Sequence, residues 1–322
     1  MKLNRRSFLH RSAALGALAC PALLRAQPQY PDAPIRFLIP TPVGGGHDTM
    51  MRLIGQKLTE AWGQPCLVES RSGGSGMVSI GSALNAPADG YTFLLTFTGF
   101  VTNLVLQPSP NYTLADLAPV CMLCITPVAL GVRRSLGVNT LEEFVRKAKA
   151  EPGKLSYASY GQGSAAHFVG EMLSEAAGIQ LNHVPYRGEA PAIQEVLGEH
   201  VDACIVSVGG VMRYPDRMQA VAVASPTRFP LYQALPTFAE AGYASVDFPG
   251  WAGVHARAGT PQAIVERVSA ELARIVKLPD VAPRLLELGF EPVGWNPDQT
   301  GTFVKEQLDM AESVARSGRV RI

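Results

Sequence analysis

Apolar residues along this chain follow two spacings, one typical of β-strands and one typical of amphipathic helices. Residues 35–39 form a short apolar run of strand length. Ile54, Leu58 and Trp62 then recur at helical spacing until Gly63, a residue type that commonly ends helices. This order predicts a strand followed by a helix, which is the beginning of an α/β unit.

The same alternation continues along the rest of the chain. We predict further strands at 66–69, 91–96, 120–132, 156–159, 181–185, 201–207, 219–224 and 251–255. Predicted helices lie between Thr140 and Pro152, at 165–177, at 191–197, after Pro261 and at 303–314. Strands that alternate with helices predict an α/β fold, and the pattern restarts near residue 128 as a second unit of the same type. A proline-spaced stretch at 226–249 predicts connecting loops.

The first 26 residues have the layout of an export signal. Arg5 and Arg6 precede an apolar stretch at 13–24, and the small residue Ala26 follows it. The paired arginines are typical of a twin-arginine signal, whereas an ordinary secretory signal and an uncleaved anchor share the same general layout. The apolar stretch is short for a membrane span. We therefore predict that residues 1–26 are cleaved and that the mature chain lies in the periplasm.

Charge and length restrict the classes of function. The predicted leader contains five Lys or Arg residues and no Asp or Glu, so its removal changes the formal net charge from +1 to −4. A chain with this charge lacks the basic surface expected of a nucleic-acid-binding protein. The chain of 322 residues is long enough for two ordinary domains with sizeable cores. We predict a two-domain globular protein that binds no nucleic acid.

Two cysteines with CxxC spacing invite a redox or zinc interpretation. Cys121 and Cys124 lie in the run 120–132, which we interpret as a strand in which residues three apart face opposite sides. A zinc site would also need a second ligand pair at a suitable spacing, and the sequence has none. We therefore favour buried free thiols over a disulfide or a metal site.

Motifs of catalysis and of cofactor binding are weak or missing. Ser75 and Ser164 sit among glycines, but neither fits G-x-S-x-G, and no P-loop or H-E-x-x-H occurs. The segment 161–166 matches the dinucleotide pattern G-x-G-x-x-A, yet the strand that follows it ends in Tyr-Arg without the acid expected for a ribose. Three histidines are too widely spaced for a local metal motif, namely His47, His167 and His183. We predict no enzyme activity, no cofactor and no metal.

Two glycine-rich loops each follow a predicted strand. Residues 44–46 follow the first strand and open directly into a helix, and residues 72–76 follow the second strand. Backbone N–H groups without side-chain obstruction, at the positive end of a helix dipole, bind anions. Glycines also serve tight turns alone, but two such loops at the carboxyl ends of neighbouring strands favour a ligand site. We predict that these loops bind a carboxylate.

Short segments along the chain resemble one known family. The segments are PTPVGGGHDT at 40–49, VESRSGGSG at 68–76, DGYT at 89–92, GKLSYAS at 153–159, Gly163-Ser164, HVPYRG at 183–188 and AGTP at 258–261. Together and in this order they resemble the Bug receptors of tripartite tricarboxylate transporters. Each segment alone is weak, but the combination is specific and covers nearly all of the predicted mature chain.

This resemblance implies a fold and a function. The fold would be α/β of the type II periplasmic-binding kind, a clamshell of two lobes joined by two hinge crossovers. Lobe one would comprise 29–126 plus 251–322, and lobe two 127–250. The function would be a receptor that encloses a small organic acid and delivers it to integral membrane transporter subunits. We expect a monomer, and a ligand sensor for a membrane signalling partner or an exported enzyme on the same fold are the alternatives.

The resemblance also implies a set of ligand-binding residues. In the family, ligand carboxylates are held mainly by backbone N–H groups, hydroxyls and waters, with few charged side chains. The matching positions here are Val43, Gly44, Gly45, Asp48, Arg71, Gly73, Gly76, Ser159, Gly163, Ser164, Tyr186 and Ser207. For Asp48, capping of the helix that begins beside it is an equal alternative.

The chain departs from the family pattern at a few positions. Many relatives carry an aspartate at the end of the strand 201–205, whereas this chain has Val206 followed by Ser207. If this position lines the cleft, an uncharged residue disfavours a ligand ammonium, and we predict a plain organic acid over an amino acid. His47 and Ser72 also replace more usual residues, which leaves the shapes of both glycine-rich loops open.

Overall fold

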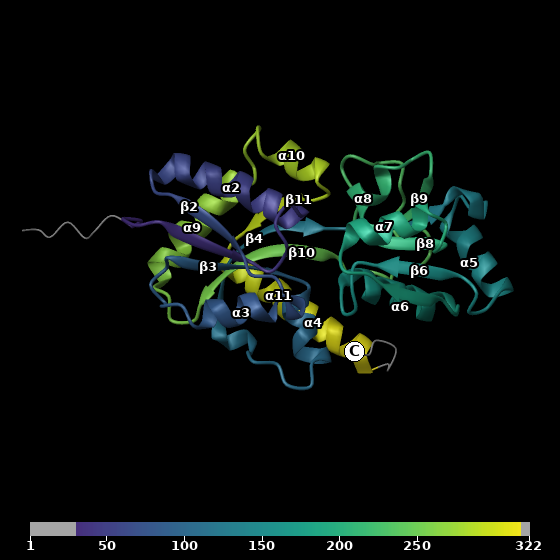
Figure 1. Ribbon diagram of the computed structural model, residues 1–322, viewed down its shortest axis with the longest axis horizontal. Coiled ribbons are helices and arrows are strands. Elements are labelled where there is room, and N and C mark those ends of the chain that lie inside the picture. Colours follow the sequence, from purple (N-terminus) through teal and green to yellow (C-terminus); the bar gives the residue numbers. More distant parts are fainter. Residues whose placement is uncertain (1–29, 317–322) are drawn as a thin grey trace, which may run out of the picture.

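The computed structural model describes residues 30–316, and the predicted export signal at 1–26 lies outside them. Two β-sheets, each flanked by helices, lie one beside the other along the long axis of the molecule (Figure 1). The predicted class of fold, α/β with two lobes and two crossovers of the chain, is confirmed.

The first sheet has six strands in the spatial order β11-β4-β10-β3-β1-β2. Its strands are β1 (Ile35–Ile39), β2 (Cys66–Ser70), β3 (Thr92–Phe97), β4 (Leu117–Thr126), β10 (Gly250–Arg257) and β11 (Glu291–Trp295). Strand β1 pairs in parallel with β2 and β3, and β10 lies antiparallel between β3 and β4. The carboxyl ends of β1, β2, β3 and β4 therefore lie at one edge of the sheet.

The second sheet has five strands in the spatial order β7-β6-β8-β5-β9. Its strands are β5 (Val128–Arg133), β6 (Ser156–Ser159), β7 (Asn182–Pro185), β8 (Ala203–Ser207) and β9 (Met218–Ala224). Strand β6 pairs in parallel with β7 and β8, and β5 lies antiparallel between β8 and β9. In each sheet, one of the antiparallel strands comes directly from the other lobe: β10 in the first sheet, where β11 is also antiparallel to β4, and β5 in the second.

Helices cover both sheets. Around the first sheet they are α2 (Gly46–Trp62), α3 (Met77–Leu84), α4 (Gly99–Leu106), α9 (Gln262–Ile275), α10 (Ala282–Glu287) and α11 (Pro297–Arg316). Around the second sheet they are α5 (Leu141–Ala150), α6 (Ala165–Ala177), α7 (Glu189–Leu197) and α8 (Val208–Met212). Helix α6 has the predicted bounds, and its N-cap Ser164 accepts the N–H of His167. Periodicity did not predict α3, α4, α8, α10 or β11, all of which have eight residues or fewer.

The apolar run 120–132, predicted as one strand, is divided between the two sheets. Strand β4 ends at Thr126 and β5 begins at Val128. Pro127 lies between them, and a proline cannot donate a ladder hydrogen bond. Thr126 pairs with the first residue of β10, and Val128 pairs with Ser207, the last residue of β8. This crossover therefore joins the carboxyl edges of the two sheets.

The prediction that Cys121 and Cys124 face opposite sides is wrong. Strand β4 has irregular register against β10 between Cys124 and Met122, which is the signature of a bulge. Because the bulge adds a residue, both cysteines join the same core cluster. Both are free thiols, and burial raises the pKa of Cys121 to about 12. A thiol in this state is protonated and unreactive at neutral pH.

The C-terminal helix α11 packs on both lobes. Its residue Val304 joins a core cluster of the first sheet together with Trp251. About two turns later, Ala311 joins the large core cluster of the second sheet, which also contains Phe144. In Figure 1, α11 (yellow) passes below the junction of the lobes, close to α4. Helix α11 therefore connects the lobes on one side of their junction.

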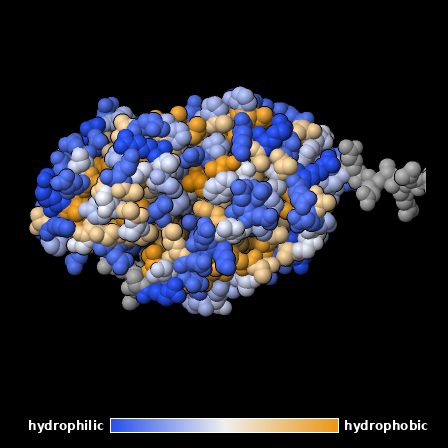
Figure 2. Space-filling view, turned by 180° about the vertical axis from the view of Figure 1, so that it is seen from behind, coloured by the Kyte–Doolittle hydropathy of each residue, from blue (hydrophilic) through white to orange (hydrophobic). Residues whose placement is uncertain are grey.

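The molecular surface is mixed in polarity. On the face shown in Figure 2, apolar residues (orange) lie in small patches among hydrophilic ones (blue). Most large apolar side chains are instead buried in the core clusters of the two lobes. Within residues 30–316, no helix has the length and apolar character that crossing a membrane requires.

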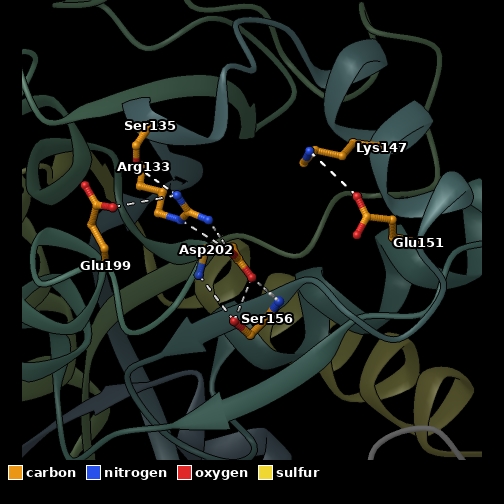
Figure 3. A network of polar contacts seen from close by, with 7 residues as sticks. All are labelled: Arg133, Ser135, Lys147, Glu151, Ser156, Glu199 and Asp202. Atoms are coloured by element: carbon orange, nitrogen blue, oxygen red, sulfur yellow. Dashed lines mark hydrogen bonds and ion pairs between the residues drawn. The ribbon is translucent and has the colours of Figure 1, made fainter.

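A polar network stabilises the amino edge of the second sheet (Figure 3). Asp202 accepts hydrogen bonds from Arg133 at 2.8 Å and from the backbone N–H and hydroxyl of Ser156 at 3.0 Å each. Burial opposes ionisation of Asp202, but these hydrogen bonds outweigh it and lower the pKa of the carboxyl. The network ties β5, β6 and the residue before β8 at the edge opposite the predicted ligand loops.

We expect Asp202→Asn to lower the free energy of unfolding by about 1–3 kcal/mol at pH 7, because an amide replaces an ionised acceptor of four hydrogen bonds. Urea denaturation measures this change. The matched control is Glu151→Gln, which removes exposed ion pairs to Lys147 (Figure 3) and to Lys154 and should change stability by about 0.5 kcal/mol or less. Equal effects of the two substitutions would contradict a stabilising role of the Asp202 network.

Because the folded-state pKa of Asp202 is lowered, the difference in the free energy of unfolding between wild type and Asp202→Asn should be complete above about pH 4 and disappear at lower pH.

Candidate ligand-binding site between the lobes

The predicted site residues lie at the carboxyl edges of both sheets. Ile39 and Ser70 are paired at the ends of β1 and β2, so the first loop (residues 40–45) and the second loop (residues 71–76) leave the first sheet together. Ser159 and Pro185 are paired at the ends of β6 and β7, so the third loop (residues 160–164) begins beside Tyr186. Because the crossover at Pro127 joins the two carboxyl edges, the loops of each lobe face the other lobe.

The two lobes touch through the segment that follows α10. A methyl group placed on Gly289 would lie 3.3 Å from the N atom of Gly209 and 3.6 Å from Oγ of Ser207. The next residue, Phe290, lies under the first loop, because a methyl group on Gly46 would lie 3.3 Å from its ring. A continuous series of contacts thus leads from the first loop of lobe one to the end of β8 in lobe two.

Asp48 shapes the first loop from inside helix α2. Its Oδ2 accepts the N–H of Gly44 at 2.9 Å and the Nε–H of Arg52 at 3.0 Å. The hydrogen bond from Arg52, with that from Gly44, lowers the pKa of the carboxyl against the effect of burial. The N–H of Gly45 donates to the Pro42 carbonyl at 3.3 Å. The observed contacts of Asp48 are therefore within the loop, and the N–H groups left for an anion are those of the first turn of α2.

His47 lies in an aromatic cluster behind the first loop. Its ring centroid is 5.9 Å from that of Phe97 and 5.3 Å from that of Phe290. Burial lowers the pKa of His47 to about 4, so the imidazole is neutral at neutral pH. Its Nε2 atom is buried without a hydrogen-bond partner among the described residues. His47 therefore adds bulk beside the loop but no charge.

The second loop has a backbone that only glycine adopts readily. Gly73, Gly74 and Gly76 have φ values of +139°, +54° and +98°. The side chain of Arg71 is exposed, and its Nη2 lies 3.4 Å from Oε2 of Glu69. Arg71 thus places an exposed cation at the start of the second loop, paired with a neighbouring acid.

Exposed apolar side chains accompany both loops of lobe one. Val43 in the first loop is 69% exposed, and Val78, directly after the second loop, is 51% exposed. Both side chains stand beside backbone N–H groups of the glycine-rich loops. The loops therefore offer apolar contact together with polar contact.

The third loop is held by its own hydroxyls. Ser164 donates its hydroxyl to the Gly161 carbonyl at 2.6 Å and accepts the N–H of His167 at 3.3 Å. Ser159 is fully buried, and its Oγ lies 2.7 Å from Nε2 of His183. Because the hydroxyls of these predicted site residues are used within the protein, the groups of the third loop that remain for a ligand are backbone groups.

Two stacked histidines support the third loop. The rings of His167 and His183 are 4.0 Å apart between centroids and nearly parallel. Nδ1 of His167 accepts the N–H of Gly163 at 3.2 Å, so this nitrogen carries no proton. Burial lowers the pKa of His167 to about 4, and burial with the neighbouring imidazole lowers that of His183 to about 3. His167 lies in α6 and His183 in β7, 16 positions apart in the sequence, and the packing of α6 on β7 brings the two rings together.

The end of β8 differs most from what the sequence predicted. Val206 is fully buried in a core cluster, so it does not line the cleft. Its uncharged side chain therefore gives no reason to exclude a ligand ammonium. The hydroxyl of Ser207 donates to Glu189 at 2.8 Å and accepts the N–H of Gly210 at 3.0 Å. Tyr186 donates its N–H to the Ser159 carbonyl at 2.9 Å. Sequence reasoning missed Glu189 because it lies on a different element, at the start of α7.

Cavities and ion sites elsewhere do not compete with this site. A cavity of about 290 Å³ is lined by Leu84, Asn111, Asp116, Arg257 and Ala258, none of which is a predicted site residue. No three His, Cys, Asp or Glu side chains within residues 30–316 come together in a group that could hold a metal ion. The loops between the lobes thus offer backbone N–H groups, neutral imidazoles and few charges.

Fold and site together define a class of protein, the two-lobed solute-binding proteins whose ligand loops stand on facing sheet edges. Residues 50–318 match the family described as "Tripartite tricarboxylate transporter family receptor". The chain belongs to this family, and its predicted resemblance to the Bug receptors is confirmed.

Individual relatives agree with this assignment. Protein BugT of Bordetella pertussis is 32% identical over 292 residues, which cover 89% of this chain and 90% of BugT. The solved structure of Rpa4515 from R. palustris with adipate is similar with a TM-score of 0.83 and 29% identity, covering 91% of this chain and 99% of that one. MatC from Rhodopseudomonas palustris with bound malate is similar with a TM-score of 0.77 and 26% identity, covering 88% and 99%.

The buried histidines make stability depend on pH. Burial lowers the pKa of His47, His167, His183 and His255 to about 4, 4, 3 and 3. An unfolded histidine has a pKa of about 6.5, so below that pH the unfolded chain binds protons that the folded chain does not bind. We expect the free energy of unfolding to be highest above about pH 6.5 and to fall by up to about 1.4 kcal/mol per pH unit for each histidine as the pH approaches 4.

Urea denaturation between pH 7 and pH 4.5 measures this slope. His167→Gln retains an acceptor toward Gly163 but cannot titrate, so its slope should be shallower than that of the wild type. The exposed His200 provides the control His200→Gln, which leaves the buried set intact. An unchanged slope in His167→Gln would show that His167 does not contribute.

Proposed function

We propose that this chain is exported to the periplasm, encloses a small carboxylate-bearing organic molecule between its lobes and presents it to the integral membrane subunits of a tripartite tricarboxylate transporter. The observation that carries the proposal is the position of the glycine-rich loops, at the carboxyl edge that faces the second lobe. Family membership and the adipate and malate bound to two similar proteins support a carboxylate as ligand.

Neutral donors suit a receptor that has to exist both empty and loaded. A buried cation would remain unpaired in the empty state, at a large cost, whereas backbone N–H groups can be hydrated until the ligand arrives. Closure of the lobes then removes water, which strengthens each hydrogen bond to the carboxylate. The ligand shifts the chain toward the closed state, and the membrane partner would bind that state.

One copy of the chain is sufficient for this function. All the loops described above belong to a single polypeptide, so we propose that the receptor acts as a monomer. We propose a receptor rather than an enzyme, because the family to which the chain belongs is described as a transporter receptor family. A sensor for a membrane signalling partner would use the same closure, and loss of acid uptake on deletion of the gene would favour transport.

We expect residues 27–322 to be stabilised by one class of small carboxylic acids in a thermal-shift screen. A ligand at about 100 times its Kd adds about 2.7 kcal/mol to the stability of the folded state. The screen should contain mono-, di- and tricarboxylates, aromatic acids and amino acids, with the matching alcohols and amides as controls. Absence of a shift with every acid would overturn the proposal.

We expect Gly44→Ala to weaken binding of the acid found in that screen by about tenfold or more, because a methyl group enters the first loop and disturbs its left-handed backbone. Gly44 has φ +83° and no atom within 4 Å of the added methyl group. The matched control is Gly137→Ala, at φ +71° and equally open space but remote from the loops. Both substitutions should cost similar stability, and only Gly44→Ala should change the Kd measured by calorimetry. Unchanged affinity in Gly44→Ala would remove the first loop from the site.

A further inference from the structure

A carboxylate lies at the contact between the lobes, where the sequence predicted none. Glu189 is the first residue of α7, and its two oxygens accept the backbone N–H of Ser207 at 3.1 Å and the Ser207 hydroxyl at 2.8 Å. Ser207 in turn adjoins Gly289 of lobe one, whose added methyl group would lie 3.6 Å from the same hydroxyl oxygen. Glu189 is therefore one residue away from the other lobe, at the edge of the sheet from which the third loop departs.

Helix α8 leaves room for this carboxylate. A methyl group on Gly210 would lie 2.3 Å from Oε1 of Glu189, closer than any side chain allows. The carboxyl thus occupies the space that a side chain at Gly210 would need. Its position is set by packing as well as by hydrogen bonds.

The charge of Glu189 is not neutralised by a cation. Neither of its hydrogen bonds from Ser207 comes from a charged group. None of the ion pairs found within residues 30–316 includes Glu189. A carboxylate has about four acceptor positions, so two remain for a further donor.

We propose that Glu189 determines which group the ligand carries at the end remote from its bound carboxylate: a hydrogen-bond donor such as a hydroxyl, an amide N–H or an ammonium, and not a second carboxylate. This inference rests on the proposed binding of a carboxylate between the lobes. Lobe closure lowers the local dielectric, so a donor at Glu189 gains strength while a second anion there is repelled more strongly. The site is thereby polarised, with anion-binding loops in lobe one and an acceptor in lobe two.

Ligands matched in length test this selectivity. For chains of four, five and six carbons, calorimetry compares the simple acid, its ω-hydroxy and ω-amino derivatives and the dicarboxylate. At the length that binds, the wild type should prefer the ω-hydroxy or ω-amino acid to the dicarboxylate by about tenfold or more. A dicarboxylate that binds as tightly as the donor-bearing acid would overturn the inference. Failure of every acid to bind would overturn the proposed function itself.

Substitution of Glu189 tests its role directly. Glu189→Gln retains an acceptor for the Ser207 hydroxyl, and it should reduce the preference by about tenfold, weakening the ω-amino acid and strengthening the dicarboxylate. Glu175→Gln removes an exposed negative charge from α6 of the same lobe and should leave the preference unchanged. Circular dichroism and thermal unfolding check that both variants are folded. An unchanged preference in folded Glu189→Gln would assign Glu189 a purely structural role, and if that variant does not fold, the wild-type ranking decides.

Discussion

The crossover at Pro127 is the constraint on which the rest of the structure depends. One residue separates the end of β4 from the beginning of β5, and one residue spans only about 3.5 Å. Thr126 and Val128 both stand at the carboxyl edges of their sheets, so these edges have to adjoin. The return at Gly250, directly opposite Thr126, repeats the connection. Every loop that leaves a carboxyl edge therefore faces the other lobe, and a site between the lobes follows from the connectivity of the chain.

Many polar groups of the loops at this junction form hydrogen bonds within the loops or with the helices that follow them. Asp48 accepts the N–H of Gly44, Ser164 bonds to Gly161, and His167 accepts the N–H of Gly163. Such bonds reduce the conformational freedom that a ligand would otherwise have to remove, so the loops are largely preformed. The supporting imidazoles are neutral because burial disfavours their charged form. An anion can then be bound mainly by oriented backbone, which carries no net charge into the closed cleft.

In the site that we propose, one lobe supplies hydrogen-bond donors and the other supplies an acceptor. The glycine-rich loops of lobe one present N–H groups, whereas Glu189 in lobe two presents a carboxylate with two neutral hydrogen bonds. Helix α11 and the two crossovers restrict how the lobes move relative to each other, since α11 packs into cores on both sides. Contact of Gly289 with Gly209 then brings the two halves together at one defined place.

Local patterns were sufficient for the longer elements and for the positions of the glycine-rich loops. Apolar spacing predicted β1, α2 and α6, because a strand or a long amphipathic helix has to present an apolar face to its own sheet. The short helices α8 and α10 were missed, since five or six residues are too few to show a period. The apolar pattern of the run 120–132 does not mark where β4 ends and β5 begins, because both halves are equally apolar and only the sheet they join distinguishes them.

The sequence by itself determined that two α/β units exist and that glycine-rich loops end their first strands, because these features depend on neighbouring residues. Only the tertiary structure decided which way each polar group points. The bulge in β4 placed Cys121 and Cys124 in one core, the packing of α6 on β7 stacked His167 on His183, and α7 carried Glu189 to Ser207. These contacts join segments that are distant in sequence or depend on register, and register is set by the packing of the whole sheet.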